Sequence, residues 1–312
     1  MPRTRTRGLG RENPIPGGNT EYVDWLRSRG VPLFEAGGNW WQVYRRSLVP
    51  ATTVPCYRRL SEESARELMR ASGALLIRYS SDPCDEPTEW WYTICDRYDP
   101  GSLSGKTRNK INKGRRDCRI AIVEAGWLES NGYSCYVAAH TRYEGVRPAP
   151  EHVWREEVRA SAGGPVEYWA IFVGEKLAGY CKCVVERDQV ATAAGKYDPA
   201  FFKHRTVNGL VGAQLEHYVR DQGRTVTNGN RAILHDTNIQ EFLFDHGFRK
   251  QFCRLNVHYS AGLGLAVRGL YPWRRLVSKL PGKADPVKAL LLQEEWRRAT
   301  AATDLSTSRR DT

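Results

Sequence analysis

The residues best suited to chemistry gather between positions 230 and 238, where Arg231, His235 and Asn238 stand close together. An imidazole titrates near neutrality, so His235 can serve as a general acid or base, or it can simply hydrogen-bond a backbone carbonyl. Arg231 and Asn238 can bind a carboxylate, a phosphate or a tetrahedral oxyanion. We therefore predict His235, Arg231 and Asn238 as the catalytic residues.

The flanking pattern predicts a strand before this polar cluster and a helix after it. Residues 225–227 are β-prone and end in the turn signal Asn228-Gly229. Beyond the cluster, apolar residues recur at the helical spacing of three and four: Ile239, Phe242 and Leu243. Gly247 can close this helix in the left-handed conformation, and another strand begins at Phe248. Polar residues between a strand end and a helix N-terminus usually line a site.

Asn238, then a helix, then Gly247-Phe248 and a strand resembles the end of an acyltransferase domain of the GNAT superfamily. The order of predicted elements from Arg119 onward, β-α-α-β-β-β-α-β-α-β, is also the order of such a domain. The resemblance covers roughly residues 104–262. Any strand–helix–strand unit could carry the same residues, so the order of the upstream segments matters to this interpretation.

The resemblance implies a cofactor site at the start of the long central helix. In GNAT enzymes the loop before that helix holds the cofactor pyrophosphate through backbone N–H groups and the helix dipole. The matching region here supplies four predicted cofactor-binding residues, Lys203, Arg205, Asn208 and Gly209, but not at the usual spacing. The alternative is that Gly209 and Gly212 only allow close helix packing.

The same resemblance places substrate-binding residues at the end of the third strand of the domain. Lys196, Tyr197 and Asp198 would face one cleft there. Many acetyltransferases carry a tyrosine in the last helix as the general acid, and this chain has Leu243 at that position. The acid would then come from elsewhere, and His235 is the best candidate.

A strongly basic stretch, residues 103–119, leads into the predicted domain. It resembles the segment that opens the second domain of FemAB-like proteins, where it lies near the donor or acceptor groove, and we predict that Arg108 binds substrate. A solvated basic helix is the alternative. FemAB-type relatives take the acyl group from an aminoacyl-tRNA and lack the usual pyrophosphate signature, which this chain also lacks.

The predicted fold class is α/β (α+β), a GNAT-like mixed central sheet flanked by helices with an N-terminal αβ lobe. Composition and pattern divide the chain into five parts: a disordered basic tail (1–20), the N-terminal lobe (21–103), the GNAT-like domain (104–262), a C-terminal helical extension (263–300) and a disordered tail (301–312). Within the extension, Asp285-Pro286 is a good helix start, and Val287, Leu290, Leu291 and Trp296 can dock the helix on the body.

The chain has 312 residues and a net charge of +12, which favours an anionic partner such as nucleic acid or a phosphorylated cofactor. No apolar run approaches the roughly 18 residues of a membrane span. The eight Cys and seven His are dispersed, so we expect no metal site and reduced thiols in a cytoplasmic protein without integral membrane contact.

These expectations combine into an N-acyltransferase that transfers an acyl group from an activated donor to an amine. Acyl-CoA, for example acetyl-CoA, is the preferred donor because it is the commoner choice of the superfamily, and aminoacyl-tRNA is the alternative. Family analogy makes the acceptor a small amine or sugar, such as an envelope or polysaccharide precursor. A competing class is a nucleic-acid-binding protein that uses the GNAT-like fold without catalysis.

Overall fold

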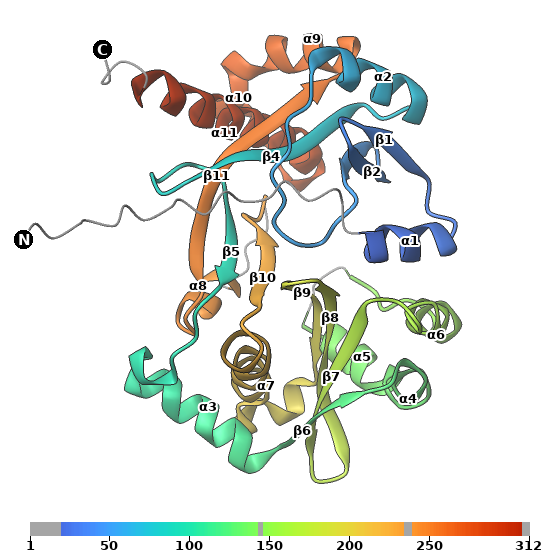
Figure 1. Ribbon diagram of the computed structural model, residues 1–312, viewed down its shortest axis with the longest axis vertical. Coiled ribbons are helices and arrows are strands. Elements are labelled where there is room, and N and C mark those ends of the chain that lie inside the picture. Colours follow the sequence, from blue (N-terminus) through green and yellow to red (C-terminus); the bar gives the residue numbers. More distant parts are fainter. Residues whose placement is uncertain (1–19, 143–145, 234–238, 308–312) are drawn as a thin grey trace, which may run out of the picture.

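The computed structural model describes residues 20–142, 146–233 and 239–307, and the strands of these residues form a single sheet (Figure 1). The sheet has eleven strands in the order β1-β2-β3-β4-β11-β5-β10-β9-β8-β7-β6. Their bounds are β1 (Leu33–Ala36), β2 (Asn39–Tyr44), β3 (Ser47–Pro50), β4 (Leu76–Cys84), β5 (Trp91–Cys95), β6 (Arg119–Val123), β7 (Val166–Val173), β8 (Lys176–Glu186), β9 (Gln189–Tyr197), β10 (Thr225–Asn230) and β11 (Arg249–Tyr259).

Helices pack against the sheet along its length (Figure 1). The α-helices are α1 (Thr20–Ser28), α2 (Glu62–Ser72), α3 (Gly105–Asp117), α4 (Ala125–Asn131), α5 (Tyr133–His140), α6 (Glu151–Arg159), α7 (Thr206–Leu215), α8 (Ile239–Phe244), α9 (Ala261–Leu270), α10 (Arg274–Val277) and α11 (Asp285–Thr307). Short 3₁₀ turns are η1 (Pro100–Ser102), η2 (Pro199–His204), η4 (Tyr271–Trp273) and η5 (Gly282–Ala284), and a π-helical turn, η3 (Glu216–Asp221), extends α7. None of these helices combines the length and the apolar character that spanning a bilayer requires.

Strand β11 joins the two halves of the sheet. It pairs antiparallel with β4 on one side, where Leu255 meets Ser80, and with β5 on the other, where Phe252 meets Trp91. Strand β5 in turn pairs with β10. Strands from before and after residue 103 therefore alternate in the sheet, and a domain boundary at that residue stays a prediction.

Two helical layers cover opposite faces of the half formed by β6–β10 (Figure 1). On one face, apolar residues of α3 and α7, such as Ile111 and Leu210, meet Ile171 and Val190 of the sheet. On the other face, α4, α5 and α6 pack around a cluster of buried residues: Leu128, Cys135, Trp154, Val158, Tyr168 and Tyr180. The hydrophobic core thus lies on both sides of the strands that carry the predicted site.

Local signals in the sequence predicted several elements closely. Ser61 caps α2, its side chain accepting from the Ser64 N–H, and Gly73 ends the helix in the left-handed conformation (φ 69°). The hairpin of β7 and β8 turns at Gly174, as expected. Helix α11 begins at Asp285, and Leu291 and Trp296 are buried, whereas Val287 is 37% exposed and does not dock the helix.

Three local predictions were wrong. The sequence pattern predicts one strand over residues 39–48, but these residues form two strands of a hairpin, because Arg45 adopts a left-handed conformation (φ 59°) that its residue type does not signal. The pattern also predicts one helix over residues 128–144, but the helix breaks at Gly132, where a side chain would meet Trp154. Asn228-Gly229 is no turn: β10 runs through it with a shift of register, and Gly229 (φ 81°) forms a bulge.

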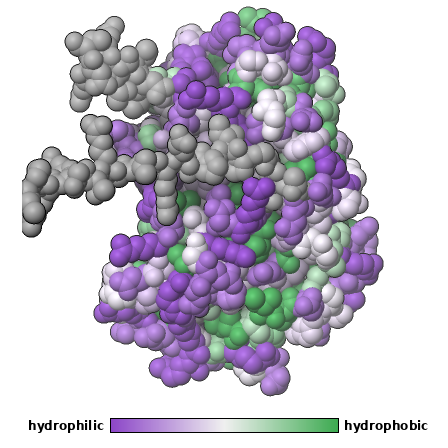
Figure 2. Space-filling model, in the orientation of Figure 1, coloured by the Kyte–Doolittle hydropathy of each residue, from purple (hydrophilic) through white to green (hydrophobic). Residues whose placement is uncertain are grey.

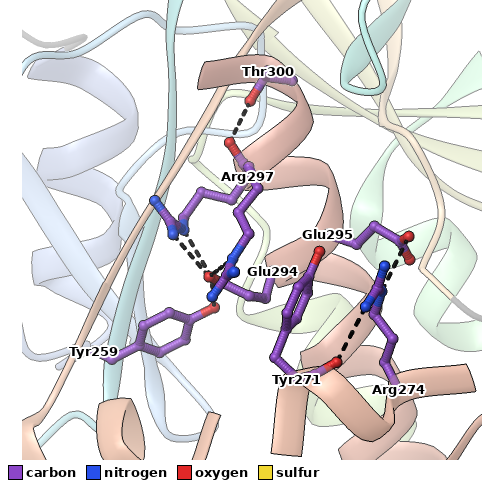
Figure 3. A network of polar contacts seen from close by, with 8 residues as sticks. Tyr259, Tyr271, Arg274, Glu294, Glu295, Arg297 and Thr300 are labelled. Atoms are coloured by element: carbon purple, nitrogen blue, oxygen red, sulfur yellow. Dashed lines mark hydrogen bonds and ion pairs between the residues drawn. The ribbon is translucent and has the colours of Figure 1, made fainter. Parts of the chain in front are cut away.

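Helix α11 is fastened to β11 by a buried carboxylate (Figure 3). Glu294 is 2% exposed and accepts hydrogen bonds from Arg297 (2.7 and 2.8 Å), from Arg298 Nε (2.7 Å) and from the Tyr259 hydroxyl of β11 (3.0 Å). Burial alone would raise the pKa of Glu294, but the hydrogen bonds from the two arginines outweigh burial and lower that pKa to about 2. The carboxylate is therefore charged in the folded protein, and the two arginines compensate its charge.

We expect Glu294→Gln to reduce the free energy of unfolding by about 2 kcal/mol at neutral pH, because it removes the charge that the two arginines share. The pKa of Glu294 lies below its usual value near 4.5. Its contribution to stability is thus present above about pH 4.5 and is lost as the pH falls toward 2. As the pH falls over that acidic range, urea unfolding should show a smaller loss of stability for the variant than for the wild type.

Glu295→Gln is the matched control, since Glu295 is the next residue of α11 and pairs only loosely with Arg274 (3.4 Å). An exposed pair of this kind contributes less than about 1 kcal/mol. Equal effects of the two substitutions would contradict the role given to Glu294.

Candidate active site

The parallel strands β9 and β10 separate after their first three pairs of residues. Thr225, Val226 and Thr227 pair with Gln189, Val190 and Ala191, and each strand then continues without the other. At the point of separation the Asn228 side chain donates hydrogen bonds to the carbonyl (3.2 Å) and hydroxyl (2.8 Å) of Thr192. A crevice outside the carboxyl ends of neighbouring parallel strands is where open α/β sheets bind ligands.

Lys196, near the carboxyl end of β9, points toward α5. Its Nζ lies 3.4 Å from Nε2 of His140 and 5.5 Å from the ring centre of Tyr136. His140 Nδ1 lies 2.7 Å from the Tyr136 carbonyl, so it carries the proton, and Nε2 is left as an acceptor facing Lys196. Burial lowers the pKa of the Lys196 ammonium. A lysine with a lowered pKa can accept a proton.

Tyr197 does not face the same side as Lys196, which corrects the expectation of one cleft shared by all three residues. Successive residues of a strand point to opposite faces, and Tyr197 packs within the core formed with α7, its ring lying over Gly179 and Gly195. Asp198 caps the following 3₁₀ turn by accepting from the Ala200 N–H (2.9 Å). Lys196 and Asp198 thus lie beside α5, next to His140 and Cys135, whereas Tyr197 does not.

Arg231 is held by other side chains. Its guanidinium bonds the carbonyl (2.8 Å) and carboxylate of Glu89 and lies over the rings of Trp91 (4.4 Å) and Trp296 (4.0 Å). These contacts tie the end of β10 to β5 and α11, so Arg231 has a structural function, and its predicted catalytic role remains a prediction. His235 and Asn238 lie outside the described residues.

The start of α7, the predicted pyrophosphate site, is covered by α3. A Cβ on Gly114 of α3 would lie 2.6 Å from the Arg205 carbonyl oxygen and 2.7 Å from the Gly209 Cα. The Gly209 N–H donates to the Arg205 carbonyl within the helix (2.9 Å). The missing Cβ of Gly209 therefore serves helix packing, the alternative that the sequence left open.

Asn208, also predicted to bind a cofactor, is buried and donates to Nε2 of His246 at the end of α8 (3.1 Å). His246 Nδ1 lies 2.7 Å from the Phe242 carbonyl, and burial lowers the pKa of this histidine, so it is a neutral acceptor. The pair locks α7 to α8. Lys203 and Arg205 remain exposed beside the same helix start, and Arg205 adopts a left-handed conformation there (φ 58°).

Arg108 lies on the exposed side of α3, where its guanidinium donates to the Gly101 carbonyl (2.8 Å). Helix α3 also carries exposed Lys106 and Arg116. Because Arg205 touches α3 at Gly114, the cations of η2 and α3 belong to one positively charged surface.

A cavity of about 190 Å³ lies at the carboxyl end of β10 and was not foreseen from the sequence. Gly229 and Asn230 form one wall, and residues of β4, β5 and the loop after β3 form the others, among them Arg78, Ser80, Tyr92 and Val54. Small-molecule sites usually measure several hundred Å³. This cavity therefore fits one head group or side chain of a larger ligand.

Arg78 makes the cavity suited to an anion. Burial lowers the pKa of its guanidinium, and its nearest polar partner is the neutral Gln293 of α11 (3.4 Å). Within residues 20–142, 146–233 and 239–307, Arg78 forms no ion pair with a carboxylate. A charge removed from water is usually paired, so a half-buried arginine that lines a cavity without a carboxylate partner indicates a site for a carboxylate or phosphate. No signal in the sequence singled out Arg78, because the cavity depends on non-local strand pairing.

Metal-ligating side chains do not cluster in the described part of the chain, where no three His, Cys, Asp or Glu residues are placed to hold an ion. The polar side chains near the ends of β9 and β10 include Lys196, His140, Asn228 and Arg231. These groups can move protons and bind anions.

Comparisons with known proteins bear on the fold. No family model matches the sequence, and no curated protein does. Among solved structures, the C-terminal domain of an Agrobacterium fabrum protein assigned as a lysylphosphatidylglycerol synthetase superposes with a TM-score of 0.50 and 12% identity, over 80% of this chain and 91% of that one. FemX superposes with a TM-score of 0.52 and 9% identity, over 80% and 93%.

A tandem GNAT protein from the clavulanic acid biosynthesis pathway aligns at a TM-score of 0.42, with 11% identity, over 72% of this chain and 81% of that one. The likeness to FemX and to the synthetase domain shows the fold of this chain. The prediction of a FemAB-like, GNAT-like mixed sheet flanked by helices is confirmed.

Arg78→Met should leave the free energy of unfolding unchanged or raise it by about 1 kcal/mol, because Arg78 is half-buried without a carboxylate partner among the described residues. Phosphate or succinate should raise the Tm of the wild type by binding only the folded state, and the variant should lose this increase. Differential scanning fluorimetry across anion concentrations measures both effects.

Arg231→Met provides the comparison, since that guanidinium already has Glu89 as partner. It should lower the Tm and keep the anion-dependent increase. An anion effect of equal size in Arg78→Met would show that the cavity is not the anion site.

Proposed function

We propose that this chain is an N-acyltransferase in which an amine attacks an activated acyl group at the crevice between β9 and β10. The observation that carries the proposal is the Lys196–His140 pair at the carboxyl end of β9, beside the point where the parallel strands separate. The confirmed FemAB-like fold agrees with it, although fold alone does not fix an activity.

The reaction requires that the amine of the acceptor is uncharged. It also requires a base that takes the proton released when the amine attacks. The amine nitrogen bonds to the acyl carbon, the bond to the oxygen or sulfur of the donor breaks, and the amine proton passes to Lys196 in its neutral form. His140, an acceptor at 3.4 Å, orients the lysine nitrogen. The predicted acid for the leaving group remains His235, with Asn238 beside it.

Two features favour an aminoacyl-tRNA over acyl-CoA as the donor. Helix α3 covers the turn of α7 that would grip a pyrophosphate. The adjoining surface exposes Lys106, Arg108, Lys203 and Arg205, none of which forms an ion pair with a described carboxylate. Phosphate groups of an RNA bind to such exposed cations. Acyl-CoA would need to bind by another route.

The acceptor, in this proposal, carries an acidic group besides its amine. The cavity at the end of β10 offers Arg78 to a carboxylate or phosphate of the acceptor, with the phenol of Tyr92 nearby in its lining. An amino sugar or envelope precursor bearing such a group meets both requirements.

The donor is tested by binding. Arg108→Glu with Lys110→Glu should weaken binding of mixed tRNA about tenfold or more at low salt and reduce the salt dependence by roughly two phosphate contacts. The charge reversal Arg66→Glu with Arg70→Glu on α2 is the control and should change neither quantity. Micromolar calorimetric binding of acetyl-CoA, with no effect of the α3 variant on tRNA, would instead assign acyl-CoA as the donor.

Catalysis is tested by the release of labelled amino acids from aminoacyl-tRNA in the presence of amino sugars. Lys196→Met should slow release on the order of a hundredfold and remove the rise of rate with pH that deprotonation of the lysine produces. Lys182→Met is the matched control, because burial also lowers the pKa of Lys182 on the neighbouring strand β8. Binding of tRNA without release by the wild type would identify a non-catalytic nucleic-acid-binding protein.

A further inference from the structure

An exposed apolar surface lies on the segment that follows β11, residues 261–280, which comprises α9, η4, α10 and the turn after it. Its large exposed side chains are Leu265, Leu270, Trp273, Leu276 and Leu280. Leu265 is 68%, Trp273 60% and Leu276 58% exposed. Single exposed apolar residues are common, but five within so short a segment indicate an interaction surface.

The charge of this segment has one sign. Residues 261–280 contain three arginines and one lysine and neither Asp nor Glu. Arg274 pairs with Glu295 of α11, whereas Arg268, Arg275 and Lys279 form no ion pair with residues that the structure describes. The apolar side chains are therefore interspersed with cations that are available to a negatively charged partner.

The inner side of the segment is firmly attached, so its outer side chains are held in place. The Tyr271 ring lies between the guanidinium groups of Arg274 (4.4 Å) and Arg298 (3.8 Å). Arg274 also donates to the Tyr271 carbonyl (3.3 Å) and reaches Glu295, as Figure 3 shows. Val267 of α9 is buried beneath. The exposure of Trp273 and Leu276 is thus a property of a fixed surface.

We propose that the segment 261–280 docks the protein on the surface of a bilayer that contains anionic phospholipids. Trp273, Leu276 and Leu280 recur three and four residues apart and would enter the boundary between head groups and acyl chains. Tryptophan favours that boundary because its ring is apolar and its N–H is polar. Arg268, Arg275 and Lys279 would meet the lipid phosphates.

The geometry fits docking in the plane of the membrane. Helix α9 has ten residues and α10 four, about 15 and 6 Å long, whereas the hydrocarbon core is about 30 Å thick. Figure 2 shows apolar atoms among hydrophilic ones at the upper end of the molecule, where α9 lies in Figure 1. A protein partner would need a surface that is both acidic and apolar, and an anionic bilayer has both properties.

The proposal is tested by flotation of the full chain with vesicles of phosphatidylcholine alone or mixed with phosphatidylglycerol. We expect binding to the anionic vesicles and at least about tenfold weaker binding to neutral ones, given roughly one kcal/mol for each cation near an anionic surface. Trp273→Ala with Leu276→Gln, and separately Arg275→Glu with Lys279→Glu, should each weaken binding to anionic vesicles about tenfold or more.

Three controls make the result specific to this surface. Val153→Gln and Lys176→Glu change an exposed apolar residue and an exposed lysine elsewhere and should leave vesicle binding unchanged. The α3 variant, Arg108→Glu with Lys110→Glu, should also bind vesicles normally, because those cations serve another partner.

Two outcomes would overturn the proposal. The first is a wild-type chain that does not bind anionic vesicles. Equally, both variants of the segment could still bind them while the α3 variant does not. The second is a wild-type chain that is dimeric in solution and ignores vesicles, with variants of the segment that are monomeric. That result would assign the surface to a second copy of the chain.

Discussion

The site depends on the hydrogen bonding of one strand, β10. On one edge it pairs with β9 only as far as Thr227, and on the other it shifts register at Gly229 before pairing Asn230 with Tyr92 of β5. Beyond this point the part of β9 that carries Lys196 runs without β10 beside it. The bulge on the second edge shapes the wall of the cavity that contains Arg78. The cavity and the part of β9 that carries Lys196 thus both lie where the regular pairing of β10 ends.

The sequence predicted what local signals determine: the cap at Ser61, the hairpin at Gly174 and the order of strands and helices that identifies a GNAT-like fold. It could not predict contacts between distant residues, such as Lys196 with His140 or the position of Arg78 in a cavity. It also could not show that Arg231 is already bound between two tryptophan rings. Residue type indicated chemistry at 230–238, but strand pairing decides which side chains remain available.

Two charged side chains of opposite sign, Glu294 and Arg78, differ in how the protein compensates their charge. Glu294 is surrounded by two arginines and a phenol, so its charge is compensated inside the protein and holds α11 on the sheet. Arg78 has an amide as its nearest polar partner, so its compensation must come from outside. Glu294 belongs to α11, and Arg78 contacts the same helix through Gln293 (3.4 Å). A change in how α11 packs would therefore reach the cavity directly.

The alternation of strands in the sheet has a consequence for biosynthesis. Strands β4 and β5 are synthesised early, yet the strand that belongs between them, β11, leaves the ribosome only after the whole of α3 to α8. Until then β4 and β5 each present an open edge, and the second exposes the run Trp91-Tyr92-Thr93-Ile94. Unpaired apolar edges invite pairing with other chains, and long-range strand pairs form slowly. A nascent chain released before residue 259 would lack the strand that closes its own sheet, and such a chain would aggregate unless a chaperone protects it.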